Sequence, residues 1–164
     1  MNYVLMSLAL IAAILAVFAI ALYIRSKYMR SYEKKFQEAF KADSNNDFNK
    51  AIKKYEDVIK GADENNPILI NTFLLLAKAY HEKGSENDVQ ALELIDKTIS
   101  LLQNNKVNQQ EAYIKQALFY KADFLSQINQ PLKAAALFKD IQIKYAGDSI
   151  LQKKISQKLA ELVD

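Results

Sequence analysis

A continuous apolar segment, residues 4–24, constrains this chain more than any other feature of its sequence. It reads VLMSLALIAAILAVFAIALYI and has no charged residue, with Ser7 as its only strongly polar side chain. At about 1.5 Å per residue, a helix of this length just crosses a hydrocarbon core of roughly 30 Å. In lipid such a segment must be helical, because its backbone groups find no water to bond. The sequence therefore predicts a membrane-spanning helix.

A cleaved signal peptide is the competing interpretation of this segment. Signal peptides carry a positive n-region, a shorter apolar core and a cleavage site of small residues. Here the first three residues have no side-chain charge, and the apolar run ends in Leu22, Tyr23 and Ile24 rather than in an A-x-A pattern. We therefore expect residues 1–24 to remain on the mature chain as a transmembrane anchor.

Basic residues follow the apolar segment, and none precedes it. Lys and Arg near the ends of a span stay on the cytoplasmic side, which predicts a cytoplasmic C-terminal domain; a periplasmic domain is the alternative. Beside lipid head groups, basic residues also gain on the order of 1 kcal/mol each from anionic lipid. These residues lie in a juxtamembrane segment, residues 25–35, and are Arg25, Lys27, Arg30, Lys34 and Lys35.

Four alanines, at spacings of three and four residues, form one stripe along the apolar segment. Small residues on one face let transmembrane helices approach closely, so this stripe would suit packing against the transmembrane helix of a partner. The stripe consists of Ala9, Ala12, Ala16 and Ala19.

The remaining chain is predicted to be all-α. It has 164 residues in total with only 3 Gly, 2 Pro and no Cys, and Ala, Leu, Lys, Glu, Gln and Ile dominate. This composition favours helix and suits one compact domain, residues 36–164. Apolar periodicity and turn residues predict helices over 31–42, 47–60, 67–83, 89–103, 109–127, 131–145 and 149–162, with the apolar stripe of the last formed by Ile150, Leu151, Ile155, Leu159 and Leu162.

Small residues recur in pairs on consecutive predicted helices. The pairs are Ala39 with Ala51, Ala77 with Ala91, and Ala122 with Ala134, which are 12, 14 and 12 residues apart. A small residue on each helix lets two helices cross closely, and a large residue one turn later fills the space beside the crossing. Those large residues are Tyr55, Ile95 and Phe138.

This pattern resembles the tetratricopeptide repeat family, whose signature is W-x2-L-G-x2-Y followed by A-x3-F. The best match is Phe73-x2-Leu76-Ala77-x2-Tyr80, then Ala91-x3-Ile95. The chain departs from the family in having Lys121 and Lys35 at expected apolar positions and in alanine spacings of 40 and 43 residues, against a period of about 34. The resemblance implies about three helical hairpins and a C-terminal capping helix; an unrelated helical bundle is the alternative.

In this family the first helix of each hairpin lines a concave face that binds peptides. The resemblance implies an apolar groove with a polar rim, suited to an amphipathic helix or an extended peptide, unless the apolar residues pack inside the domain. The residues placed on this face are Phe36, Phe40, Asn71, Leu74, Lys78, His81, Gln116, Phe119, Asp123 and Gln127.

Few residues could carry chemistry. His81 is the one histidine and there is no cysteine, so neither a transition-metal site nor nucleophilic catalysis has the residues it needs. We expect His81 to be solvated, and we expect no catalytic residue, metal or cofactor. No basic stripe interleaved with aromatics follows the juxtamembrane cluster, which argues against nucleic-acid binding.

The function expected from these features is that of an adaptor. The Asn-, Lys- and Ile-rich composition is typical of AT-rich bacterial genomes. Family members with an N-terminal anchor and a small repeat domain commonly assist the assembly of envelope, secretion or motility complexes. We therefore expect a single-pass scaffold that binds partner proteins at the bacterial inner membrane, with a periplasmic module that assists secreted or outer-membrane proteins as the alternative.

Overall fold

The computed structural model describes residues 2–62, 67–104 and 109–162, with side chains for 10–28, 31–62, 68–104 and 109–162. This part of the chain is helical and contains no strand, which confirms the all-α prediction. The elements in order are α1 (Asn2–Ser44), α2 (Phe48–Gly61), α3 (Pro67–Lys83), the 3-10 helix η1 (Ser85–Asn87), α4 (Asp88–Asn104), α5 (Gln110–Gln127), α6 (Pro131–Lys144) and α7 (Ser149–Glu161).

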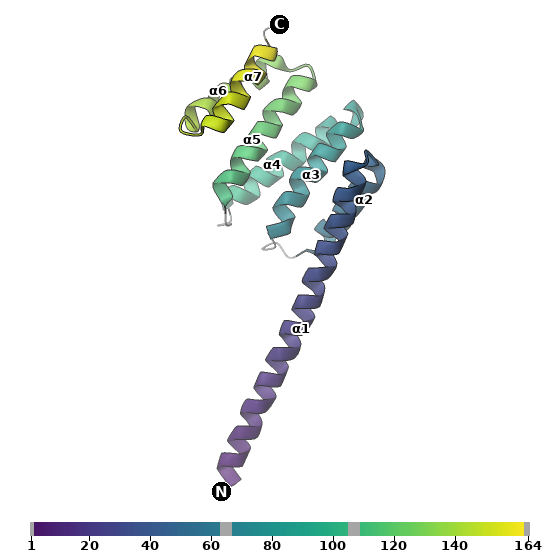
Figure 1. Cartoon of the computed structure of the whole chain (residues 1–164), viewed down its shortest axis with the longest axis vertical. Coiled ribbons are helices and arrows are strands. Elements are labelled where there is room, and N and C mark those ends of the chain that lie inside the picture. Colours follow the sequence, from purple (N-terminus) through teal and green to yellow (C-terminus); the bar gives the residue numbers. More distant parts are fainter. Residues whose placement is uncertain (1, 63–66, 105–108, 163–164) are drawn as a thin grey trace.

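The first helix is continuous from the apolar segment into the folded domain. It extends over 43 residues without a break, and Figure 1 shows its N-terminal half projecting alone from the other helices. Large apolar side chains on this half are exposed, among them Leu10, Phe18 and Tyr23. Among the described residues, α1 is the helix long and apolar enough to cross a membrane. A signal sequence has the same length and apolar character.

Local chemistry explains where the later helices begin and end. Asp47 caps α2, since its carboxylate accepts from the backbone N–H of Lys50 at 3.2 Å, and Asp148 caps α7 in the same way. Pro131 opens α6, and Gly84, with φ of 147°, ends α3. The predicted loop over 85–88 is instead the 3-10 helix η1 and the start of α4. Residues 63–66, predicted to end one helix and begin the next, lie outside the described residues. Of the turn predicted at 104–108, Asn104 is instead the last residue of α4, and residues 105–108 lie outside the described residues.

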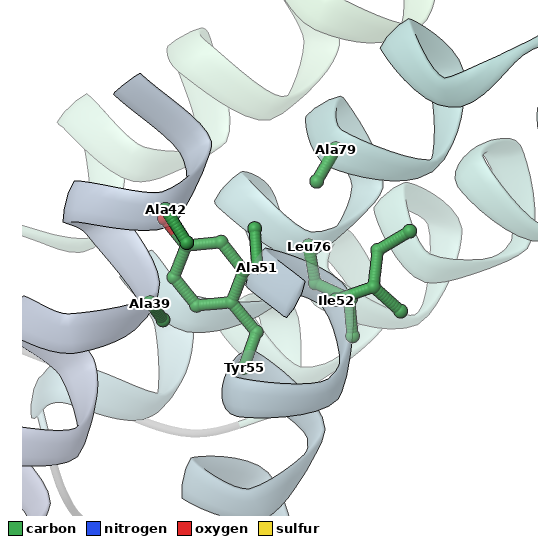
Figure 2. Close-up of a cluster of buried hydrophobic side chains, with 7 residues drawn as sticks. All are labelled: Ala39, Ala42, Ala51, Ile52, Tyr55, Leu76 and Ala79. Atoms are coloured by element: carbon green, nitrogen blue, oxygen red, sulfur yellow. The ribbon is translucent and has the colours of Figure 1, made fainter. Parts of the chain in front are cut away.

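The paired alanines mark the crossings between consecutive helices, as predicted. All six are fully buried, and each pair belongs to one buried cluster. In the first cluster, Figure 2 shows the Tyr55 ring reaching from α2 to Ala42 of α1, beside Ala39 and Ala51. Tyr55 and Phe138 are both fully buried, and burying an apolar side chain such as that of Phe138 contributes about 1.5–3 kcal/mol.

The helices pack in chain order as three hairpins, α1 with α2, α3 with α4 and α5 with α6, and α7 packs on α6. The first helices of successive hairpins also contact each other, α1 with α3 and α3 with α5, so they form one layer. The stripe predicted for the last helix is correct for Ile155, which is buried, and for the partly buried Leu151, Leu159 and Leu162. It is wrong for Ile150, which is 72% exposed.

Candidate functional site

The layer formed by α1, α3 and α5 carries the residues that the sequence placed on a binding face. Phe40 on α1 is half exposed, and Gln116 on α5 is exposed as well. Leu74 is not available to a partner, because it is only 1% exposed and lies in the core with Ala117 and Phe124. The helical period predicted Leu74 on this face, whereas the structure has it packed against α5.

Two aromatic residues of the predicted binding face pack partly inside the hairpins. The Phe36 ring packs on Tyr55, with ring centroids 6.1 Å apart, and the Phe119 ring meets Phe138 edge-on at 5.6 Å. Both rings are partly buried against these clusters. Phe36 therefore supports the first hairpin, whereas Phe119 also lines a groove described below.

His81 is not solvated, which corrects the expectation from the sequence. Its side chain is 10% exposed, and its ring stacks on Phe124 with centroids 4.2 Å apart. Nδ1 lies 2.7 Å from Asp88 Oδ1, and Nε2 lies 2.9 Å from Gln127 Oε1. Because both ring nitrogens have partners on other helices, His81 ties α3 to the start of α4 and to the end of α5.

The polar contacts continue from His81 towards the C-terminal helix. The Gln127 amide donates to Asp123 Oδ2 at 3.2 Å, and Lys158 of α7 lies 2.8 Å from the other oxygen of Asp123. The carboxylate of Asp123 raises the pKa of Lys158. Asp123 and Gln127, both predicted to face a partner, therefore connect the second hairpin to α7.

A second polar group lies where α1 meets α3. Asp43 is buried, and burial raises the pKa of its carboxyl, against the attraction of Lys78. The Tyr55 hydroxyl is buried beside this carboxyl, and burial followed by the charge of Asp43 raises the pKa of Tyr55. Further along the layer, Asn71 donates to the Tyr113 hydroxyl at 3.4 Å. Lys78 and Asn71 thus lie near the junctions between neighbouring hairpins.

A groove of about 460 Å³ opens between α5 and α7. Phe119, Tyr120, Leu151 and the exposed Ile150 supply its apolar surface. We name this the α5–α7 groove; its lining also includes Ala112, Lys115, Gln116, Asp148 and Lys154.

The charges of the α5–α7 groove favour an acidic ligand. Lys115 bonds Asp148 at 3.1 Å, and this contact raises the pKa of Lys115. The pKa of Asp148 is lowered by the backbone N–H of Leu151 and then by Lys115. Lys154 forms no ion pair within the described ranges, so its charge is available. The sequence identified Gln116 and Phe119 here but missed Lys154 and Ile150, since only the placement of α7 brings them to the face.

The residues expected at a membrane lie along the isolated part of α1. Arg25, Lys27 and Lys34 are exposed, and Lys35 is partly buried near the start of the packed domain. Ala12, Ala16 and Ala19 are exposed along the apolar half. The side chains of Ala9 and Arg30 lie outside the described residues.

Side chains that could bind a metal ion do not cluster among the described residues. Within the described ranges, no three His, Asp or Glu side chains gather in a way that could hold a metal ion. The one histidine has both ring nitrogens engaged by Asp88 and Gln127. No protein-family model matches the chain, and no curated protein is significantly similar to it.

Proposed function

We propose that this chain is a membrane-anchored scaffold of the tetratricopeptide-like class, which binds partner proteins and has no enzymatic activity. The observation that carries the proposal is the alanine pair at the crossing of each of the three hairpins, followed by a helix that closes the array. In such arrays each unit contacts only its neighbours, and the small rotation between successive units creates an extended concave surface for binding. Contacts of α1 with α3 and of α3 with α5 support an inner layer of first helices.

The anchor part of the proposal rests on α1. Its apolar half projects free of the domain, and exposed Arg25 and Lys27 follow the span, which favours a cytoplasmic domain at the bacterial inner membrane. In that location the scaffold would serve an envelope, secretion or motility complex. A periplasmic module that assists secreted or outer-membrane proteins is the second candidate. A phosphatase fusion at the C-terminus distinguishes the two, since it is active only in the periplasm.

The α5–α7 groove is the proposed binding site for the partner. Exposed Ile150 and partly exposed Phe119 supply an apolar floor, while Lys154 supplies an unpaired cation at the edge. An amphipathic helix or extended segment with apolar anchors and a nearby carboxylate matches this surface. Gln116 and Phe40, exposed on the same layer, would extend the contact towards the first hairpin.

A pull-down through the intact anchor in mild detergent tests this proposal. Ile150→Glu places a charge in the groove at an exposed position, so it should remove the bound partners without unfolding the chain. Val89→Glu is the matched control, because Val89 is 66% exposed on α4, away from this groove. A set of partners unchanged by Ile150→Glu would exclude the α5–α7 groove as the binding site.

A further inference from the structure

The hydrogen-bond partners of His81 determine how many protons its ring must carry. Nδ1 lies 2.7 Å from Asp88 Oδ1 and Nε2 lies 2.9 Å from Gln127 Oε1, so both nitrogens face oxygen atoms. Carboxylate and amide oxygens accept hydrogen bonds and cannot donate them. A neutral imidazole has one N–H, whereas the imidazolium has two. Both contacts are therefore satisfied together when the ring is the imidazolium.

The orientation of the Gln127 amide is fixed by its other partner. Its Nε2 donates to Asp123 Oδ2 at 3.2 Å, which leaves Oε1 as the atom that faces His81. A reversed amide would place Oε1 against the Asp123 carboxylate, where two acceptors repel. Lys158 of α7 lies 2.8 Å from the other oxygen of Asp123, so this carboxylate accepts from both sides. The amide cannot turn to offer His81 a donor without losing its own bond.

The surroundings of the ring also favour a positive charge. The side chains of His81 and Asp88 are both nearly buried, so water competes little for the bond between them. The ring stacks on Phe124 with centroids 4.2 Å apart. The face of an aromatic ring attracts a cation. The stacking partner and the carboxylate therefore both stabilise the imidazolium.

Charged residues reach this end of α3 from several elements. They are Lys78, Glu82 and Lys83 on α3, Asp43 on α1, Glu56 on α2, Glu86 in η1, Asp88 on α4, Asp123 on α5 and Lys158 on α7. Among the described residues, Asp88 is the charged group that bonds the His81 ring. Asp123 acts on the ring through Gln127, and Lys158 is paired with Asp123. The charge in contact with the ring is therefore negative.

We propose that His81 carries a proton on both ring nitrogens in the folded chain and acts as a pH-sensitive tie between the second and third hairpins. A ring that loses one proton keeps a single N–H. A bond to a carboxylate is stronger than one to a neutral oxygen, so this N–H stays on Asp88. The bond to Gln127 is then lost, and with it the direct polar tie from α3 to α5.

Loss of the tie acts at one end of the junction between the hairpins. His81 lies in the last turn of α3, and Gln127 is the last residue of α5. Nearer the middle, Leu74 and Ala117 remain packed in one buried cluster. The ends of the two helices can therefore separate while the chain stays folded. A histidine ordinarily changes charge between about pH 5 and pH 8, so the placement of the two hairpins should change as the pH rises through this interval.

The protonation of the ring can be measured directly, because His81 is the one histidine of the chain. Full-length protein in detergent, labelled with 15N-histidine and carrying a tag without histidine, gives one pair of imidazole nitrogen resonances. Two protonated nitrogens have similar shifts, whereas a neutral ring has one strongly displaced nitrogen. At pH 7.5 we expect the similar pair from the folded chain and the displaced nitrogen after the domain is unfolded in urea. A neutral ring in the folded chain would overturn the proposal.

Two variants show whether Asp88 holds the proton on the ring. Asp88→Asn offers an amide that can donate to Nδ1, so the folded variant should have a neutral ring at pH 7.5. Lys83→Ala changes an exposed neighbour of His81 and should keep both nitrogens protonated. A ring that stays doubly protonated in Asp88→Asn, or becomes neutral in Lys83→Ala, would contradict the role given to Asp88.

The placement of the hairpins is measured between two spin labels, since the chain has no native cysteine. Lys83→Cys and Lys133→Cys place labels at exposed positions at the end of α3 and the start of α6. Double electron–electron resonance on the full-length chain should give a narrow distance distribution at pH 5.5 and a broader, longer one at pH 8.5. Identical distributions at the two pH values would show that His81 does not tie the hairpins.

His81→Arg separates this effect from other titrating groups. Arginine is charged at both pH values and only donates, so the labelled variant should keep the narrow distribution throughout. His81→Ala has no donor and should give the broad distribution at both. Asp43, whose pKa burial raises, titrates alike in all three chains. A pH-dependent change that persists in His81→Arg or His81→Ala would assign the response to another group and overturn the proposal.

Discussion

The His81 imidazole lies flat on the Phe124 ring, with an angle of 20° between the two planes, and holds Asp88 through Nδ1. The pair joins α3 to α5 at one end of the domain. His81→Ala should destabilise the chain by about 2 kcal/mol, because it removes a bond to a charged group and leaves Asp88 nearly buried without its partner. Chemical denaturation followed by circular dichroism measures this loss. Lys83→Ala, at an exposed neighbouring position, is the control and should change stability by under about 0.5 kcal/mol.

Asp43→Asn should stabilise the chain at neutral pH. The folded state raises the pKa of Asp43 above its ordinary 3.8, chiefly through burial; Lys78 opposes the shift, and Glu82 adds to it. Above the raised pKa the folded state holds a charge that burial disfavours. The cost disappears as the pH falls through the folded pKa towards 3.8. The advantage of the Asn variant should therefore shrink over that interval, and an advantage that grows on acidification would contradict the burial of this carboxyl.

Gly61→Ala tests the close approach of α1 to the last residue of α2. A Cβ at Gly61 would lie 2.7 Å from Cε1 of Tyr32, so the ring must move. Alanine is more favourable than glycine by up to about 1 kcal/mol in a helix interior, and we expect no such gain at Gly61. It should reappear in a chain that also carries Tyr32→Ala. Gly147→Ala, where nothing lies within 4 Å of the added Cβ, should be neutral or slightly stabilising.

Enlarging a crossing alanine should be far more damaging than enlarging an exposed one. Ala77→Leu and Ala122→Leu insert three carbons where two helices meet, and each should cost at least about 1–3 kcal/mol. Ala160→Leu, at an exposed position of α7, should leave stability nearly unchanged. Equal thermal midpoints for all three variants would show that the alanines do not set the helix crossings.

Much of the fold could be predicted because its information is local. The bounds of α3 follow from Pro67 and Gly84, and the crossings follow from alanines at regular spacing. The predictions that were wrong concern residues whose neighbours in the fold are distant in the sequence. The helical period placed Leu74 on a face but could not show that α5 covers it. His81 looked solvated beside Glu82 and Lys83, since its partner Gln127 is 46 residues away.

The candidate grooves were the least predictable part. Lys154 and Ile150 line the same groove as Phe119 only because α7, which packs on α6, also lies beside α5. The periodicity of a single helix cannot predict that placement. A groove lined by α2, α3 and α4 likewise joins residues of three helices, from Glu56 to Lys97. The charged and apolar residues of each helix follow from its own sequence. Which helices lie side by side depends on how the whole domain packs.

The unbroken first helix also limits how the domain can move. At about 1.5 Å per residue its 43 residues span about 65 Å, with no glycine or proline at which to pivot. Transmembrane helices tilt by about 20° on average, so in the proposed anchor an unbroken α1 would transmit the tilt of its span to the domain. Each copy would then sweep a patch of bilayer surface tens of ångströms across, so encounters between neighbours would be governed by how far they lean as well as by how fast they diffuse.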